Sequence, residues 1–352
     1  MNSIMKKHIQ IQEDIKEMIL NNQLQQGDKL ASEAEFMSRY SVSSITVRKA
    51  LGALAEEGFI RRIQGKGSFV NDVSAVSASS MIAVLMPYSN NPDVSHLVIL
   101  QGIQRMLREE KYSLIIEWYE KGIETERHAI KRVVEKNIDG FLLYPNAPDE
   151  DLEMLLYVNG LDIPNVWLDR YNYMIESSFV SSDNYKGGIL ATQHLCDLGH
   201  KNIVFLEHEF SLSSEQERYA GFNHVLERNN LKAHRRFTVS DSDIADLCER
   251  IRSRDVTGIF CVNDKVAVET ISMLQGEGIS VPEDVSIVGF DNWDGLKLLS
   301  QRLTTIQQDF MALGMMSAKL LIDIISNDDF PAPLKYVTPV SLVKGDTTSP
   351  PR

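Results

Sequence analysis

The stretch SEAEFMSRYSVSSITVRKAL, residues 32–51, predicts two short helices joined by a tight turn. Ser32 can cap the first helix through its hydroxyl, and Glu35 three residues later completes a capping box. The second helix is expected over about 44–57, with four apolar residues on its inward face: Val47, Ala50, Leu51 and Leu54. This order is typical of a helix-turn-helix, whose second helix commonly enters the major groove of DNA.

The flanking segments extend this pattern to a winged helix-turn-helix. Upstream, Gly27 ends a segment with one helical stripe, formed by Ile11, Ile15, Met18 and Ile19. Downstream, FIRRIQGKGSFV, residues 59–70, alternates like a β-hairpin with QGKG at its tip. The pair Arg48 and Lys49 on the second helix is too small a charge to bind DNA alone. The wing adds three further cations, Arg61, Arg62 and Lys66.

Charge is distributed unevenly along the chain. The 352 residues carry a formal net charge of −13, whereas residues 1–72 hold ten Lys or Arg against nine Asp or Glu. A nearly neutral head on an acidic body can still bind phosphate if its cations share one face. The alternative interpretation of Arg48 and Lys49 is a solvated helix face without a nucleic-acid partner.

The sequence lacks the marks of exported, membrane and metal-binding proteins. The three cysteines, Cys196, Cys248 and Cys261, are widely spaced, which argues against a disulfide framework and a structural zinc. The polar N-terminus has no signal-peptide core, and no apolar run approaches the ~18 residues that span a bilayer. There is no His–Cys cluster, GxSxG elbow or phosphate-cradling glycine loop. We therefore expect a cytoplasmic protein with no metal, no other cofactor, no membrane partner and no enzymatic activity.

From Met81 onward, apolar strands alternate with helices. The expected strands are IAVLMP (82–87), SLIIEWY (113–119), GFLLYP (140–145), NVWLDR (165–170), NIVFLE (202–207), RRFTVS (235–240), GIFCVND (258–264) and DVSIVGFDN (284–292). Strands separated by helices of ten or more residues indicate βαβ units and parallel sheets. About 260 residues are too many for one small core, so two α/β lobes are expected.

The N-terminal part, residues 11–70, resembles the DNA-binding domain of the GntR family of bacterial transcription regulators. The resemblance implies DNA contacts from nine residues: Glu33, Ser43, Ser44, Thr46 and Arg48, and at the wing tip Gln64, Gly65, Lys66 and Gly67. The family usually has LPSE where this chain has LASE, and a glycine at Ser41. An arginine is typical at Ser44, and its loss removes a bidentate contact worth ~1–3 kcal/mol of base discrimination. The operator sequence therefore cannot be copied from a relative.

The C-terminal part resembles the effector domain of the lactose-repressor family, which in turn resembles periplasmic sugar-binding proteins. The matching segments begin SSDNYKGG (181–188), ERYAGF (217–222), GIFCVNDK (258–265) and LTTIQQDF (303–310). A GntR-type head on such a body resembles the arabinose-repressor group. The implied fold is a two-lobed, periplasmic-binding-protein-like α/β domain behind the winged helix.

This second resemblance implies a sugar site between the lobes. Sugar hydroxyls donate and accept, so carboxylates, amides and arginine suit them, with an aromatic face against the C–H surface. The resemblance implies polar contacts from Asp169, Arg218, Asn263, Asp291 and Gln308, an apolar wall from Phe310, Tyr88 and Trp118, and a further acceptor in Glu120. Tyr88 and Trp118 could equally pack the lobes, and Arg170 could bind sugar or bridge the lobes. Asp264 is expected to cap the helix that follows it. Many relatives have an aromatic after FTVS, where this chain continues DSDI.

These observations give one expected organisation and one expected function. The domains are a winged helix over 1–71, a linker over 72–80 and an effector domain over 81–345. Lobe 1 covers about 81–183 and 309–339, and lobe 2 about 184–308 and 340–345, so the chain crosses three times, near Asp183, Gln308 and Pro339. The expected function is a repressor that binds near-palindromic double-stranded operator DNA as a homodimer and is released by a monosaccharide, L-arabinose first. The alternatives are another sugar, a sugar phosphate, or a sugar-binding protein without a regulatory role.

Overall fold

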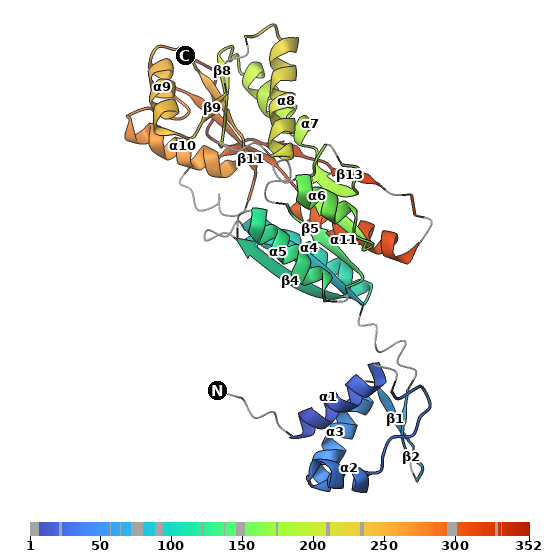
Figure 1. Cartoon of the computed structure of the whole chain (residues 1–352). Helices are drawn as coiled ribbons and strands as arrows, with labels where there is room; N and C mark the ends of the chain where they lie inside the picture. Colours follow the sequence, from blue (N-terminus) through green and yellow to red (C-terminus); the bar gives the residue numbers. More distant parts are fainter. Residues whose placement is uncertain are drawn as a thin grey trace. The chain divides into compact units, whose positions relative to one another are not determined.

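The computed structural model describes residues 7–20, 23–56, 58–63, 65–71, 80–88, 94–120, 123–136, 138–145, 152–173, 175–208, 212–232, 236–293, 301–327, 330–331 and 333–352 (Figure 1). The chain forms two compact units, Met1–Ser80 and Met81–Arg352, called here the head and the body. Each has a buried apolar core of its own. Most of the expected linker lies outside the described residues, as does Gln64.

The described part of the head contains three helices and a two-stranded wing. The elements are α1 (Lys7–Leu20), α2 (Glu33–Tyr40), α3 (Ser44–Glu56), β1 (Ile60–Ile63) and β2 (Gly67–Val70). The two strands pair antiparallel, with Ile60 opposite Val70. The predicted capping box forms, because Ser32 accepts from the Glu35 amide while the Glu35 carboxylate accepts from the Ser32 amide. The winged helix-turn-helix is confirmed.

One apolar core holds the head together. Its members come from all three helices and from the wing: Ile11, Ile15, Ile19, Leu30, Phe36, Val47, Ala50, Leu51, Leu54, Ile60 and Val70. The turn between α2 and α3 passes through Ser41, whose φ of 52° lies in the left-handed region. A side chain is disfavoured in that conformation, which is why glycine suits this position better than serine.

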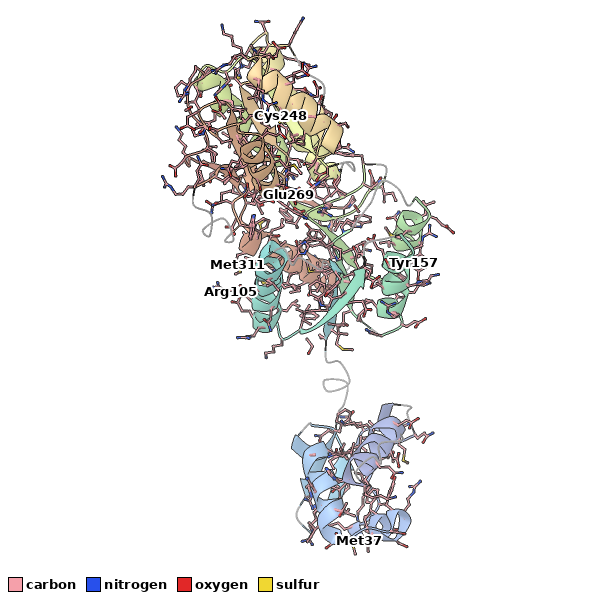
Figure 2. The ribbon with its side chains drawn as sticks, turned by 90° about the vertical axis from the view of Figure 1, so that its left-hand side faces the viewer. Met37, Arg105, Tyr157, Cys248, Glu269 and Met311 are labelled. Atoms are coloured by element: carbon pink, nitrogen blue, oxygen red, sulfur yellow. The ribbon has the colours of Figure 1, made fainter. Side chains whose placement is uncertain are left out.

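The first lobe of the body is a six-stranded parallel sheet with helices on both faces. Its strand order is β13-β7-β6-β5-β3-β4, with bounds β3 (Met81–Tyr88), β4 (Ser113–Glu120), β5 (Gly140–Leu143), β6 (Asn165–Leu168), β7 (Phe179–Ser182) and β13 (Lys335–Thr338). Helices α4 (Val94–Glu109) and α11 (Phe310–Ser326) cover one face, and α5 (Ile123–Val134) and α6 (Leu152–Asn159) cover the other. In Figure 2, Arg105 and Met311 accordingly lie on one side of the sheet and Tyr157 on the other.

The second lobe repeats this architecture. Its strand order is β14-β12-β11-β10-β8-β9, with bounds β8 (Ile203–Glu207), β9 (Phe237–Thr238), β10 (Gly258–Cys261), β11 (Ser286–Asp291), β12 (Thr304–Gln307) and β14 (Ser341–Val343). Its helices are α7 (Asn184–Asp197), α8 (Ser213–Arg228), α9 (Asp241–Arg252) and α10 (Asp264–Gly276). All strand pairs are parallel except β12 with β14. Two lobes built from parallel βαβ units confirm the predicted fold class.

The chain passes from one sheet to the other at three places. β7 of the first sheet leads into α7 of the second lobe, β12 leads into α11 of the first lobe, and β13 is followed by β14. Three crossing segments side by side form the kind of hinge about which two lobes can close on a ligand. None of the described helices is long and apolar enough to cross a membrane.

The ordered packing continues past residue 345, where the effector domain was expected to end. Buried Thr347 donates to the Ile287 carbonyl and accepts from the Thr304 amide. The Ser349 carbonyl lies 2.9 Å from Nε2 of buried His200. The C-terminal residues therefore belong to the second lobe, because they satisfy polar groups at the edge of its core.

Candidate functional sites

The start of α3 presents the predicted DNA-contacting residues of the head. Ser43 and Thr46 are joined by their hydroxyls at 3.0 Å, and the Thr46 amide donates to the Ser43 hydroxyl. Ser44 and Thr46 are half-buried, whereas Arg48 is exposed. The wing tip carries exposed Lys66 between Gly65 and Gly67, whose φ values of 74° and 116° favour glycine. The glycines are thus required by the turn that presents Lys66.

The carboxylate of Glu33 binds two arginines of the head. Its Oε2 accepts from Nε of Arg48 at 2.8 Å, and its Oε1 accepts from Nη2 of Arg62 at 2.9 Å. The hydrogen bond to Glu33 raises the pKa of Arg48 above its ordinary value. One carboxylate therefore ties together α2, α3 and the first strand of the wing.

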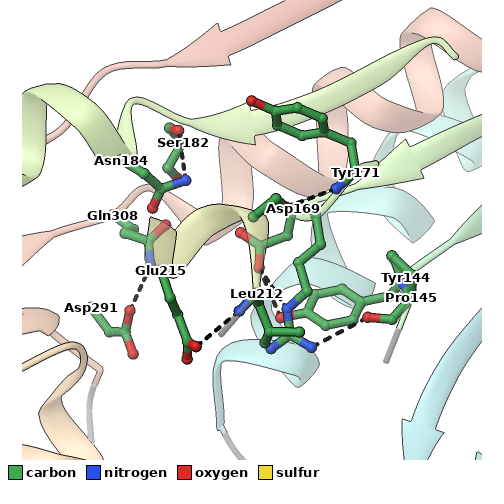
Figure 3. Close-up of polar contacts among 12 residues, drawn as sticks. Tyr144, Pro145, Asp169, Tyr171, Ser182, Asn184, Leu212, Glu215, Asp291 and Gln308 are labelled. Carbon is green, nitrogen blue, oxygen red and sulfur yellow. Dashed lines mark hydrogen bonds and ion pairs between the residues drawn. The ribbon is translucent and has the colours of Figure 1, made fainter. Parts of the chain in front are cut away.

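In the body, a polar cluster forms where strands of both sheets reach their carboxyl ends (Figure 3). It consists of Asp169, Arg170, Glu215, Arg218, Asp291 and Gln308. Asp169 follows β6, Asp291 ends β11 and Gln308 follows β12. Ligands of open α/β sheets bind at this edge of the sheet. The position fits the site that the sequence predicts.

Arg218 is buried and held by three kinds of contact. Its Nε donates to Asn184 at 2.9 Å, its Nη1 donates to the Val262 carbonyl at 2.7 Å, and its guanidinium lies 3.8 Å from the centroid of the Phe290 ring. Nη2 is 3.8 Å from Oδ1 of Asp291. The close packing of α7 on α8 fixes this side chain, since a Cβ at Gly188 would lie 2.2 Å from the Arg218 carbonyl oxygen.

The opposite side of the polar cluster is built on Tyr144. Its hydroxyl donates to Oδ2 of Asp169 at 2.9 Å, and its ring stacks under the Arg170 guanidinium at 4.8 Å. Arg170 also donates to the Pro145 carbonyl at 3.2 Å. Burial opposes the charge of Arg170, but Tyr144 and the carboxylates of Asp169 and Glu215 raise its pKa overall.

Two of the carboxylates stand on strained backbone. Asp169 has φ 68° and Asp291 has φ 124°, both in the region that side chains rarely adopt. Such strain costs of order 1–3 kcal/mol and clusters at ligand sites. In the same cluster, Oδ1 of Asp169 and Oε1 of Gln308 are buried and accept no hydrogen bond from a described residue. Buried Nε of Arg170 donates none to a described residue, although it lies 3.8 Å from Oδ2 of Asp169. A hydroxyl-bearing ligand, which both donates and accepts, would satisfy all three atoms.

Three residues of the site were not identified from the sequence. Glu215 is buried and accepts from the Leu212 amide at 3.1 Å, as Figure 3 shows. Tyr144 binds Asp169 through its hydroxyl and stacks under Arg170, as described above. Trp293 lines a cavity of about 250 Å³ together with predicted Gln308 and Phe310. Glu215 could have been noticed as an acidic residue three positions before Arg218, on the same helix face.

The predicted edge residues Tyr88, Trp118 and Glu120 lie on the neighbouring strands β3 and β4. Tyr88 and Glu120 lie opposite each other at the carboxyl ends of β3 and β4, and Trp118 lies opposite Met86. Tyr88 is 54% and Trp118 42% exposed. Among the described contacts, none joins these three residues to Asp169 or Asp291. Their effector-binding role therefore remains a prediction.

The expectation for Asp264 is wrong, and Asn263 takes its place as the cap. Oδ1 of Asn263 accepts from the Val266 amide at 2.9 Å. Asp264 is fully buried and accepts from the Thr305 hydroxyl at 2.5 Å and from the Asn292 amide at 2.6 Å. Burial raises its pKa to about 6. The tertiary partners on β12 and after β11 draw Asp264 away from the helix terminus, so Asn263 caps α10 one residue earlier.

The two lobes are also joined directly beside the polar cluster. The Tyr171 amide donates to the Ser213 hydroxyl at 3.1 Å, and the Tyr171 hydroxyl donates to Glu217. Burial raises the pKa of both Tyr171 and Glu217. Tyr171 follows Arg170 directly, so movement of the Asp169–Arg170 loop is coupled to helix α8.

Comparisons with known proteins find a matching family for the head and for the body. Residues 8–70 match the model for bacterial regulatory proteins of the gntR family, and residues 192–348 match the periplasmic binding protein-like domain. The chain is 30% identical over 345 residues to an arabinose metabolism transcriptional repressor of Halalkalibacterium halodurans, covering 90% of this chain and 89% of that protein. This chain belongs to the same family of bacterial transcription regulators.

Other members of the comparison support this assignment. An arabinose metabolism transcriptional repressor of Geobacillus stearothermophilus is 26% identical over 334 residues, 91% of each chain. The body resembles a LacI family transcriptional regulator from Enterococcus faecium solved with bound ribose, at 28% identity and a TM-score of 0.64, covering 78% of this chain and 100% of that one. These relatives are regulators and not enzymes, which agrees with the sequence prediction.

Proposed function

We propose that the chain is a cytoplasmic, sugar-responsive repressor that binds near-palindromic operator DNA as a homodimer and is released by a monosaccharide. L-Arabinose is the first candidate, because two relatives are named as arabinose metabolism repressors and a pentose is bound in a similar structure. The observation that carries the proposal is a set of three buried atoms in the polar cluster that form no hydrogen bond with any described residue: Oδ1 of Asp169, Nε of Arg170 and Oε1 of Gln308.

The charges of the polar cluster favour a neutral sugar over a sugar phosphate. Three carboxylates are present, from Asp169, Glu215 and Asp291. Both guanidiniums are already held by the protein, Arg170 by Pro145 and Tyr144 and Arg218 by Asn184 and Val262. A phosphate would meet three carboxylates beside two guanidiniums that the protein already binds in part, whereas sugar hydroxyls can donate to the carboxylates. Asn263 and Phe310 complete the proposed sugar site.

The proposed DNA contacts are Ser43, Ser44, Thr46 and Arg48 at the start of α3, with Gly65, Lys66 and Gly67 at the wing tip. Their place on a winged helix supports this assignment, as does the exposure of Ser43, Arg48 and the wing tip. Gln64, which lies outside the described residues, and Glu33 belong to the same predicted surface.

The proposed mechanism is thermodynamic linkage between the two sites. Sugar closes the lobes about the three crossing segments, and the closed body disfavours the dimer arrangement that binds both half-sites. Coupling of this kind typically amounts to ~1–3 kcal/mol, and DNA must weaken sugar binding by the same factor.

A thermal-shift screen against pentoses, hexoses, disaccharides and sugar phosphates tests the ligand class. Ligand at ~100 times its dissociation constant stabilises the native state by about 2.7 kcal/mol, which is measurable. We expect a shift with a neutral pentose and none with its phosphate. A shift with phosphates alone would refute the neutral-sugar assignment, and a sugar that binds without affecting any DNA complex would indicate a sugar-binding protein with no regulatory role.

A further inference from the structure

We infer that Glu33 is a positioning residue for DNA recognition: it holds Arg48 so that the terminal edge of that guanidinium reads a guanine. This inference rests on the proposed DNA-binding function. It assigns Glu33 a role other than direct contact with DNA, and it brings Arg62 of the wing into the recognition surface.

The geometry determines which nitrogens of Arg48 are committed. Glu33 binds the Nε of Arg48, so the Nη1–Nη2 edge points away from the carboxylate. That edge carries two parallel N–H groups, and two parallel donors match O6 and N7 of guanine. Arg62 is held instead through Nη2, which leaves its own Nε and Nη1 for phosphate or a base. A single carboxylate therefore fixes the direction of both guanidiniums.

The exposure of the three side chains supports a positioning role for Glu33. The side chains of Arg48 and Arg62 are 66% and 44% exposed, and that of Glu33 is 30% exposed. The cations thus lie outside the carboxylate, between it and solvent. A carboxylate on a DNA-facing surface repels phosphate, so its presence lowers nonspecific affinity while preserving a specific contact.

Folding alone does not require this arrangement. Exposed ion pairs contribute little to stability. The start of α2 is already capped by Ser32 and Glu35, without the Glu33 side chain. Ser44 also stands where the resembling family usually has an arginine, so fewer guanidiniums are left to read bases. DNA recognition therefore depends more strongly on the orientation of Arg48 than it would with an arginine at position 44.

The experiment uses the full chain and DNA selected by the wild type from a random-sequence pool. Affinity for the selected DNA and for unselected random DNA is measured by fluorescence anisotropy for wild type, Glu33→Gln and the control Glu17→Gln. Glu17 is exposed on α1, so its substitution removes the same charge without touching an arginine of this surface. We expect Glu33→Gln to bind selected DNA about tenfold more weakly, equivalent to ~1.4 kcal/mol. Its affinity for random DNA should stay equal or rise, and Glu17→Gln should change neither.

A double-mutant cycle with Arg48→Ala separates positioning from direct contact. If Glu33 acts chiefly through Arg48, Glu33→Gln has a much smaller effect in the Arg48→Ala background than in wild type, and the remaining effect is the part that acts through Arg62. Equal losses in both backgrounds, or a Glu33→Gln variant that still discriminates like wild type, would overturn the inference. Loss of preference at a single cytosine with the Arg48-dependent guanine retained would show that Glu33 reads a base itself. A wild-type chain that selects no DNA would refute the proposed function instead.

Discussion

Asp291→Asn removes one charge from the polar cluster with almost no change of shape. In the wild type, Oδ1 of Asp291 accepts from Nε2 of Gln308 at 2.6 Å and lies 3.8 Å from Nη2 of Arg218. An asparagine can keep the hydrogen bond from Gln308, because its own Oδ1 accepts. The fold should therefore lose only about 1 kcal/mol, the size of one ordinary hydrogen bond.

The effect on sugar binding should be larger. A hydrogen bond to a charged group contributes about 1.5–3 kcal/mol and a neutral one about 0.5–1.5 kcal/mol, so each sugar hydroxyl held by Asp291 loses about 1–1.5 kcal/mol. One such bond corresponds to about a tenfold weaker affinity and two to about a hundredfold. The Asp291 side chain is only 18% exposed, so solvent screens this loss weakly.

Isothermal titration with the sugar identified by screening measures the change. Operator affinity without sugar should stay within about twofold, because the head has its own core. The control is Asp255→Asn, an exposed aspartate of the same lobe that should change neither affinity. Unchanged sugar affinity in Asp291→Asn would refute the assignment of the polar cluster as the sugar site.

Three further changes test other parts of the structure. Gly188→Ala places a Cβ 2.2 Å from the Arg218 carbonyl oxygen, so it should destabilise the body by about 1–3 kcal/mol and weaken sugar binding. Calorimetric melting with and without sugar measures both effects. An unchanged melting temperature would contradict the close packing of α7 on α8. Burial lowers the pKa of His200, so its neutral form contributes stability that is complete above the unfolded value of about 6.5 and is lost as pH falls below it. Urea unfolding at neutral and at mildly acidic pH measures the free energy of unfolding. Between these two pH values, wild type should lose more of that free energy than His200→Gln. Equal losses in the two proteins would exclude this histidine as the cause. Ser41→Gly relieves a left-handed φ of 52° and should stabilise the head by about 1 kcal/mol in denaturant titrations, whereas a lower midpoint would argue against backbone strain there.

The fold of the head could be predicted from the sequence because the signals for its helices and wing are local. The capping box of Ser32 and Glu35, the inward face of α3 and the glycines of the wing tip all act within a few residues. Each of these features is present in the structure. The exposed ion pairs of Glu33 were not foreseeable, because they join positions that are distant in sequence and depend on how α3 packs against the wing.

Four strands of the body were not predicted because their sequences are polar. β7 ends in Ser181 and Ser182 and β12 begins with Thr304 and Thr305, yet all four residues are buried. Three of their hydroxyls form hydrogen bonds across the fold: Ser182 with Thr338, Thr304 with Thr348, and Thr305 with Asp264. Strands β13 and β14 are short and lie at sheet edges. An apolar pattern does not identify such segments, since tertiary hydrogen bonds replace hydrophobic burial.

Within the polar cluster, the family resemblance indicated the residues at strand ends but not their supports. Arg218 and Gln308 both lie against Asp291, and Figure 3 shows Asp169 in the same close-up. Tyr144 has no distinctive local signal, and the one local signal for Glu215 is its spacing from Arg218 on α8. Asp264 shows the reverse case, in which a local capping signal was overruled by contacts from two other strands.

In the proposed mechanism, sugar binding in the body and DNA binding at the head oppose each other. The most direct test measures sugar affinity in the absence and in the presence of saturating selected operator DNA. We expect operator to weaken sugar binding by about 5–150-fold, which equals the factor by which sugar weakens operator binding. Sugar affinity that is the same with and without operator would contradict this mechanism.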